Sequence, residues 1–126
     1  MPQTIDIMEK PISKVMESED LLGYYILHLQ IINILLPIKL KPREIEFIAH
    51  FLTMPGEKFS PKNKKQVREN MGLKSAGMTN YIKELTEVGF LIEKEDGLLD
   101  INPIIVPSEG IQTYTFKNVY KHRRIN

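Results

Sequence analysis

The 126-residue chain has the length of one ordinary domain, and its 42% hydrophobic and 26% charged residues are typical of a soluble globular protein. It contains no cysteine, which excludes disulfides, thiolate zinc sites and cysteine nucleophiles and fits the reducing cytoplasm. The N-terminus has neither a basic region nor an apolar core of the kind found in signal peptides, so we expect none.

The formal net charge is only +1, but the charges are unevenly distributed. Residues 1–22 hold two lysines against five acids, whereas residues 58–83 hold seven cations against one acid. The tail, residues 117–126, adds four cations and no acid. Such asymmetry indicates a surface that faces a polyanion, although a solvated helix face has the same composition.

The first predicted elements are a flexible N-terminal arm, residues 1–17, and an apolar helix over residues 18–38. Ser18 is the expected N-cap of this helix. Residues 21–38 carry no formal charge over 18 positions, which reaches the length of a membrane-spanning helix. Polar side chains within the segment, including His28 and Asn33, argue against a membrane, because each would need a partner in lipid.

This helix has apolar residues on more than one face, which indicates burial on more than one side. One row repeats at alternating spacings of three and four, the spacing of a coiled-coil seam. In a protein this small, one face can cover the domain's own core and another a second copy. We therefore expect a homodimer, with the seam formed by Leu22, Tyr25, Leu29, Ile32 and Leu36.

Three more helices are predicted between residues 42 and 88. The first begins at Pro42, and the second begins after the cap-and-proline pair Ser60-Pro61 and ends at Gly72. Lys74 stands where a serine or threonine cap is usual, so we expect Ser75 to cap the third helix. The buried side of that helix is expected to consist of Met78, Tyr81, Ile82, Leu85 and Val88.

A β-hairpin follows the last helix. The segments FLIEK and LLDIN are joined through Glu95-Asp96-Gly97, and an Asp-Gly pair between two such segments is a strong hairpin signal. Pro103 closes the second strand, and IQTYTF, residues 111–116, suggests one further strand. The predicted domain therefore covers residues 18–116, followed by the basic C-terminal tail, residues 117–126.

Two helices joined at a glycine turn and followed by a hairpin are the elements of a winged helix-turn-helix, in which the second helix enters the DNA major groove. Residues 71–91, MGLKSAGMTNYIKELTEVGFL, resemble the recognition segment of MarR-type winged-helix regulators. The roles of that family's pattern fall on Met71, Gly72, Leu73, Met78, Leu85, Gly89 and Phe90. The expected fold class is mainly α (α+β), a winged helix-turn-helix with an N-terminal apolar dimerisation helix and a short hairpin wing.

A second resemblance concerns the end of the hairpin. LDINPIIVP resembles the winged-helix replication initiators of plasmids and phages, which often carry an Asn-Pro pair after the wing, here Asn102-Pro103. The resemblances together cover about residues 42–103. The wing departs from the MarR pattern, because Lys94 is its only cation where those regulators typically carry several arginines.

The residues expected to read base edges face away from the predicted core: Ser75, Ala76, Thr79, Asn80 and Lys83. Asparagine can form two hydrogen bonds with adenine, threonine can contact a thymine methyl group, and lysine can reach guanine or a phosphate. Gly77 would permit a close backbone approach to DNA. The residues expected to contact phosphates are Lys62, Lys64, Lys65, Arg68, Lys74 and Lys94. A solvated helix face remains the alternative.

The sequence shows no pattern typical of an enzyme or of a cofactor site. Its three histidines are far apart, so no metal site is expected, and Glu46 with His50 is more simply an ordinary helix pair. There is no glycine-rich phosphate loop and no nucleophile elbow. The charge-free helix offers nothing to orient an effector, so no ligand is expected.

Three functions remain open from the sequence. The first is a small dimeric transcriptional regulator that reads a near-palindrome in double-stranded DNA. The second is a plasmid or phage replication initiator or DNA-transaction factor, and the third is a winged-helix protein–protein adaptor that uses residues 21–38 for docking. The cations beside the turn favour DNA over the adaptor. The basic tail is either an arm that contacts DNA or a disordered end that aids solubility.

Overall fold

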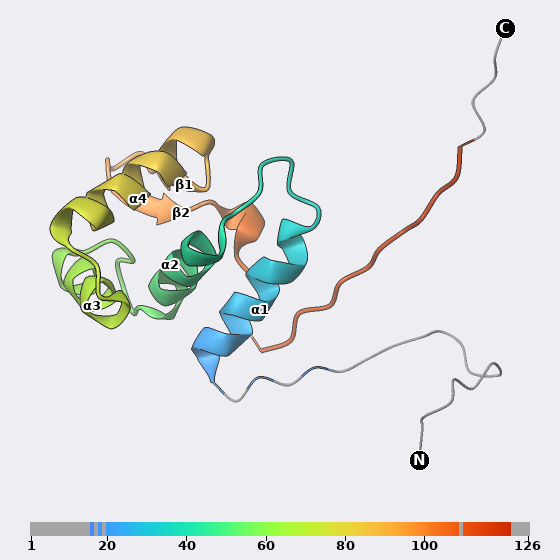
Figure 1. Ribbon diagram of the computed structural model, residues 1–126, viewed down its shortest axis with the longest axis horizontal. Coiled ribbons are helices and arrows are strands. Elements are labelled where there is room, and N and C mark those ends of the chain that lie inside the picture. Colours follow the sequence, from blue (N-terminus) through green and yellow to red (C-terminus); the bar gives the residue numbers. More distant parts are fainter. Residues whose placement is uncertain (1–15, 17, 19, 109, 122–126) are drawn as a thin grey trace, which may run out of the picture.

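The computed structural model describes residues 16, 18, 20–108 and 110–121, and within these it is mainly helical (Figure 1). The predicted N-terminal arm lies almost wholly outside the described residues, as does the end of the basic tail. The described elements are the helices α1 (Leu21–Asn33), α2 (Pro42–Thr53), α3 (Pro61–Met71) and α4 (Ser75–Val88), the strands β1 (Leu91–Glu93) and β2 (Leu99–Ile101), and a 3-10 turn, η1 (Pro103–Ile105).

Helix α1 is shorter than predicted at both ends. Its N-cap is Asp20, whose Oδ1 accepts a hydrogen bond from the Gly23 amide at 2.6 Å, so the prediction of Ser18 is wrong. The helix ends at Asn33, whose side chain bonds both the amide and the carbonyl of Leu40 at 2.7 and 3.0 Å. Lys39 donates to the carbonyls of Asn33 and Ile34, which have no partner within the helix. These contacts allow the helix to end at Asn33 and not at residue 38 as predicted.

The predicted dimer seam packs instead against the chain's own core. Leu29 is completely buried, and the other four members, Leu22, Tyr25, Ile32 and Leu36, are partly buried against the same cluster. Because α1 lies against α2, the spacing of three and four is explained by an intramolecular helix contact, and a dimer interface on these residues stays a prediction. No described helix, α1 included, combines the length and apolar character needed to cross a membrane.

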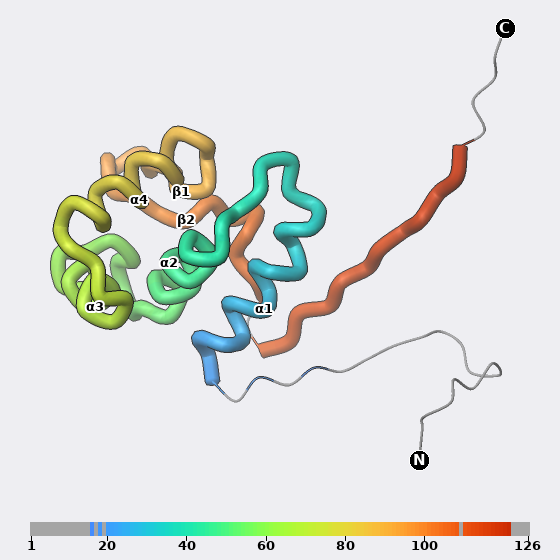
Figure 2. The backbone as a smooth tube through the Cα atoms, viewed as in Figure 1, coloured from blue at the N-terminus to red at the C-terminus, as the bar shows by residue number. Residues whose placement is uncertain are grey.

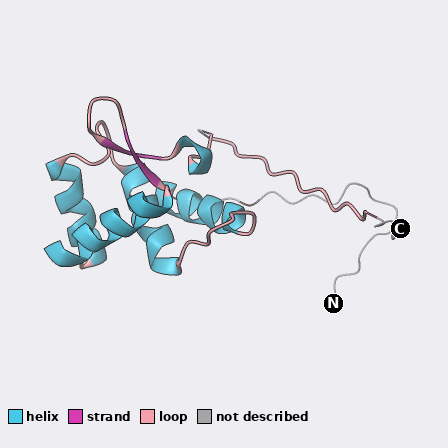
Figure 3. Ribbon diagram, turned by 90° about the horizontal axis from the view of Figure 1, so that it is seen from above, coloured by secondary structure: helices cyan, strands magenta, loops and turns pink. Residues whose placement is uncertain are grey.

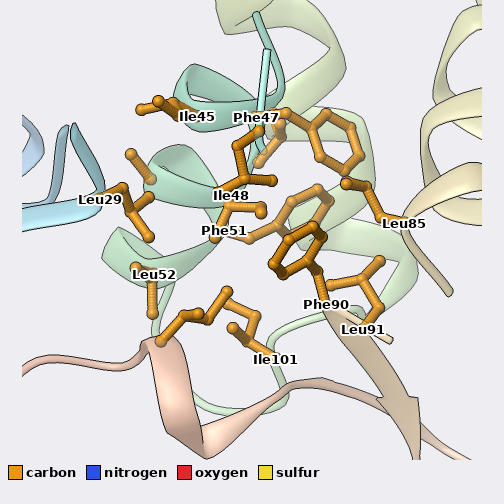
Figure 4. Close-up of a cluster of buried hydrophobic side chains, with 14 of the residues drawn as sticks. Leu29, Ile45, Phe47, Ile48, Phe51, Leu52, Leu85, Phe90, Leu91 and Ile101 are labelled. Carbon is orange, nitrogen blue, oxygen red and sulfur yellow. The ribbon is translucent and has the colours of Figure 1, made fainter. Parts of the chain in front are cut away.

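Helix α2 forms the centre of the core, with aromatic rings stacked along it (Figure 4). The ring of Phe51 lies 4.2 Å from that of Phe59 and 5.0 Å from that of Phe47. Phe47 in turn stacks on Tyr81 of α4 at 4.9 Å. Phe59, in the segment before α3, and Tyr81 of α4 are therefore each packed against a ring of α2.

The connection between α3 and α4 is three residues long. Gly72 ends α3 in the left-handed region, with φ of 65°, as the sequence predicted. Lys74 is the N-cap of α4 and makes no side-chain capping bond, and Ser75 is already helical, so the prediction that Ser75 caps the helix is wrong. Val88, expected on the buried side, is 45% exposed, so that part of the prediction is wrong.

The predicted hairpin is confirmed, with Leu91 paired to Ile101 and Glu93 paired to Leu99 in antiparallel register. Gly97 supplies the positive φ of the turn, 82°. The further strand expected at residues 111–116 is wrong: these residues form no strand but run extended away from the helices (Figures 2 and 3). Their composition favours a strand, but within the described residues no neighbouring strand lies beside them.

The extended C-terminal segment is anchored on α1 by His28. This ring is 4% exposed, and its Nε2 lies 2.9 Å from the carbonyl oxygen of Ile105 while its Nδ1 lies 2.6 Å from the Tyr114 hydroxyl. Because the carbonyl only accepts, Nε2 carries the proton and Nδ1 of the neutral ring accepts from Tyr114. The Tyr24 hydroxyl adds a third contact, donating to the Ser108 carbonyl at 2.8 Å.

Acid is expected to weaken the fold through this anchor. Burial lowers the pKa of His28 below its ordinary value of 6.5, against a smaller opposing effect of the Ile105 carbonyl. As the pH falls through 6.5, the unfolded chain therefore binds a proton before the folded chain does. The free energy of unfolding should decrease from pH 7.5 to 5.5 in urea titrations, and His28→Gln should reduce that slope.

His50 provides the comparison, because its pKa is also lowered by burial, with Glu46 opposing and Arg43 assisting. Replacing His50 by glutamine should remove its own share of the pH dependence and leave the share of His28 intact. A free energy of unfolding that is constant, or that rises, between pH 7.5 and 5.5 would contradict the assigned protonation states.

Candidate nucleic-acid interface

The outward face of α4 presents the residues that the sequence assigned to base reading. Ser75, Ala76, Thr79, Asn80 and Lys83 are all exposed, while Met78 and Leu85 on the opposite side are buried. The Thr79 hydroxyl donates to the Ser75 carbonyl at 3.0 Å, which uses its proton within the helix and leaves its methyl group and oxygen lone pairs outward. This face therefore offers an amide, methyl groups, a hydroxyl and an ammonium group to a ligand.

Arg68 connects the two helices across the turn. Its Nη1 donates to the Ser75 Oγ at 2.6 Å. A residue that we expected to contact phosphates is therefore hydrogen-bonded to one that we expected to contact bases. The bond orients Ser75, and it also aims the guanidinium at the start of α4. Arg68 has further N–H groups available for a second acceptor.

The lysines of α3 extend the same basic surface. Lys64 and Lys65 lie four and three residues before Arg68, which places them on the same side of the helix. Lys62 and Lys65 are exposed and Lys64 is half-buried. Lys74 is exposed in the turn, and Arg68 and Lys74 are therefore two cations placed beside the N-terminus of α4.

Two further cations, Lys58 and Lys94, are engaged elsewhere. Lys58 donates to the carbonyls of Leu52 and Met54 and so completes the end of α2. Lys94, expected on a phosphate, lies at the start of the hairpin turn, where its Nζ is 3.5 Å from Glu57 Oε1. Its charge is therefore partly compensated, and the hairpin adds little to the positive surface.

A cavity of about 300 Å³ opens beside α4, where the N-terminus of α2 approaches it. Asn80 and Glu84 form one side of the cavity, and Lys41 and Arg43 form the other. The sequence analysis assigned no function to these two cations. The sequence does place these two cations on either side of Pro42, but we interpreted that segment only as the start of a helix.

Arg43 also has a structural contact, because it joins α2 to the end of α3. Its Nη2 donates to the Met71 carbonyl at 3.0 Å, and its Nη1 pairs with Glu46 at 2.6 Å. The carbonyl belongs to the last residue of α3, where helical carbonyls lack partners within the helix. Arg43 therefore fixes the helix that carries the lysines.

Asn102, the residue behind the resemblance to replication initiators, has an internal function in the fold. Its Nδ2 donates to the Gly89 carbonyl at 3.0 Å, its Oδ1 accepts from the Ile104 amide at 3.1 Å, and its own amide bonds Phe90. These bonds tie the end of the hairpin to the end of α4. The Asn-Pro pair is thus explained by geometry and does not by itself favour replication.

Metal ligands do not cluster in the described part of the chain, where no group of three His, Cys, Asp or Glu side chains could hold an ion. Comparisons of the chain with protein-family models, with curated proteins and with solved structures find no match.

Proposed function

We propose that the chain is a winged helix-turn-helix protein that binds double-stranded DNA sequence-specifically and acts as a small dimeric transcriptional regulator. The observation that carries the proposal is the exposed face of α4, which has an amide, a methyl group and an ammonium group and lies next to α3 and the turn, which carry exposed cations. In this arrangement α4 lies in the major groove, and α3 lies along the backbone.

The roles of individual residues follow from their chemistry. Asn80 reads adenine, the methyl group of Thr79 contacts thymine, and Lys83 reaches guanine or a phosphate. Lys62, Lys65 and Arg68 contact phosphates, which position the protein without specifying sequence. Two copies whose α4 helices lie about 34 Å apart would read a near-palindromic site.

An alternative within DNA binding is a replication initiator. It would use the same face of α4, so both functions share the interface and differ only in what is recruited to it. We favour the regulator because the side chain of Asn102, the residue that suggested an initiator, is used in hydrogen bonds within the fold.

Replacing Gly77 by alanine tests the proposed DNA contact. Gly77 has no positive φ, and an added Cβ would meet the nearest atom, Leu73 Cδ2, at an ordinary 3.8 Å. The free energy of unfolding should therefore be about 0.5–1 kcal/mol higher in the variant, because alanine is more favourable than glycine inside a helix. If DNA approaches the backbone here, affinity should fall about tenfold, since an extra methyl group in a closely packed contact costs roughly 1–3 kcal/mol.

Urea unfolding and a DNA titration by fluorescence anisotropy give the two readouts for this variant. Thr86→Ala, at an exposed position of α4 two turns further on, is the control and should leave DNA affinity unchanged. Unchanged DNA affinity in Gly77→Ala would contradict a close approach of DNA to the start of α4.

A further inference from the structure

The C-terminal arm, residues 110–121, leaves the body of the protein in an extended conformation (Figure 1). It contains isoleucine, valine, threonine and aromatic residues, which favour β-strands. Between described residues it forms no backbone–backbone hydrogen bond. Apart from the Thr113 carbonyl, which accepts from the Gln112 side chain, no bond between described residues occupies its N–H and C=O groups, and an extended segment of this kind is a template for pairing with another strand.

The arm exposes apolar side chains that its own chain leaves uncovered. Tyr120 is 86% exposed, Ile111 81%, Val119 69% and Phe116 55%. In an extended chain alternate residues share a face, so Tyr114, Phe116 and Tyr120 lie on one side. Tyr114 contacts His28 of α1, and beyond it the aromatic face continues past the end of the body.

We propose that this arm pairs with the same arm of a second copy as an antiparallel β-ribbon centred on Phe116. The pairing would be isologous, as expected of a two-fold dimer. It would carry Tyr120 of one copy back to the start of the other copy's arm, which lies against that copy's α1. The inference rests on the dimeric part of the proposed function and replaces the predicted α1 seam, which the core already covers.

Charge is compatible with this pairing. Centred on Phe116, the register places Lys117 opposite Thr115 and Lys121 opposite Ile111 of the second copy. No lysine of the arm therefore faces a lysine, which would be unfavourable.

The exposed aromatic side chains supply part of the area that a dimer needs. An aromatic side chain buries about 150–250 Å², so the exposed parts of Phe116 and Tyr120 together offer roughly 300 Å² per copy. A standard interface buries roughly 800 Å² per partner. The remainder would come from the paired backbone, from Ile111 and Val119, and from exposed Leu21 at the start of α1.

Equilibrium sedimentation without DNA tests the inference. Wild type should have twice the chain mass of 14.6 kDa at micromolar concentration. Phe116→Glu with Tyr120→Glu should raise the dimer dissociation constant about 30-fold or more, the loss typical of buried interface aromatics. Ile104→Glu, at a residue 77% exposed outside the arm, should leave that constant unchanged. Circular dichroism should show all three proteins folded.

Crosslinking tests the register, because the chain contains no cysteine of its own. Phe116→Cys should form a disulfide-linked dimer under mild oxidation at least about tenfold faster than Asp96→Cys at the exposed hairpin turn. Equal rates would overturn the pairing centred on residue 116.

If wild type were monomeric at all concentrations, the arm pairing would be overturned. DNA binding by a single copy would then be tested separately, by its own titration. If the double glutamate variant weakened DNA binding of such a monomer, the arm would instead be a DNA contact. A dimer that persists in the double variant would place the interface elsewhere.

Discussion

Replacing Phe51 by alanine should lower the free energy of unfolding by about 3–5 kcal/mol, the usual cost of removing a buried phenylalanine ring. Phe51 is completely buried and contacts two other rings, Phe47 at 5.0 Å and Phe59 at 4.2 Å. Loss of the ring leaves a cavity between α2 and the segment that leads into α3. Because α3 is positioned from this segment, the basic surface should lose its fixed geometry as well.

Urea denaturation followed by circular dichroism measures the effect, and the unfolding midpoint should fall by about 2 M. Ile104→Ala is the matched control, since this apolar side chain is 77% exposed and removes little buried area. Comparable losses in the two variants would show that the stacked rings of α2 are not the centre of the core.

The helical part of the fold could be predicted from the sequence where local signals were unambiguous. Ser60 followed by Pro61, glycine at residue 72 and the Asp-Gly pair of the hairpin each determine a backbone geometry by themselves. These elements appear in the structure within one or two residues of their expected bounds.

The errors arose where tertiary contacts determined the outcome. The end of α1 depends on the hydrogen bonds between Asn33 and Leu40. Leu40 lies outside the helix, so the helical periodicity of the sequence does not reveal this contact. Periodicity marked Leu29 as buried but could not say whether the covering surface was α2 or a second copy. For residues 111–116, strand propensity was present, but no strand among the described residues lies beside them, and propensity alone does not form a sheet.

The sequence predicted which residues of α4 face outward, but not the contacts that they and their neighbours make. All five outward residues of α4 are exposed as expected. The bond between Arg68 and Ser75 was missed because it crosses the turn between two helices. Lys41 and Arg43 were missed because their proximity to Asn80 depends on how α2 packs against α4.

The exposed lysines of α3 should account for a large part of DNA affinity. Each phosphate contact contributes about 0.9 to the slope of log affinity against log salt concentration. Lys62→Ala with Lys65→Ala should therefore reduce that slope by about 1.8. We leave Arg68 in place because its loss would also free Ser75. Lys117→Ala with Lys121→Ala removes the same charge from the arm and should leave the slope almost unchanged.

The most direct test of DNA binding by α3 and α4 is the affinity for random duplex DNA between 50 and about 200 mM salt, the range over which phosphate contacts are most visible. For wild type and these two double variants, we predict that wild type binds at low salt and that only Lys62→Ala with Lys65→Ala has a shallower slope. Absence of binding by folded wild type at low salt, or an equal slope in all three proteins, would contradict it.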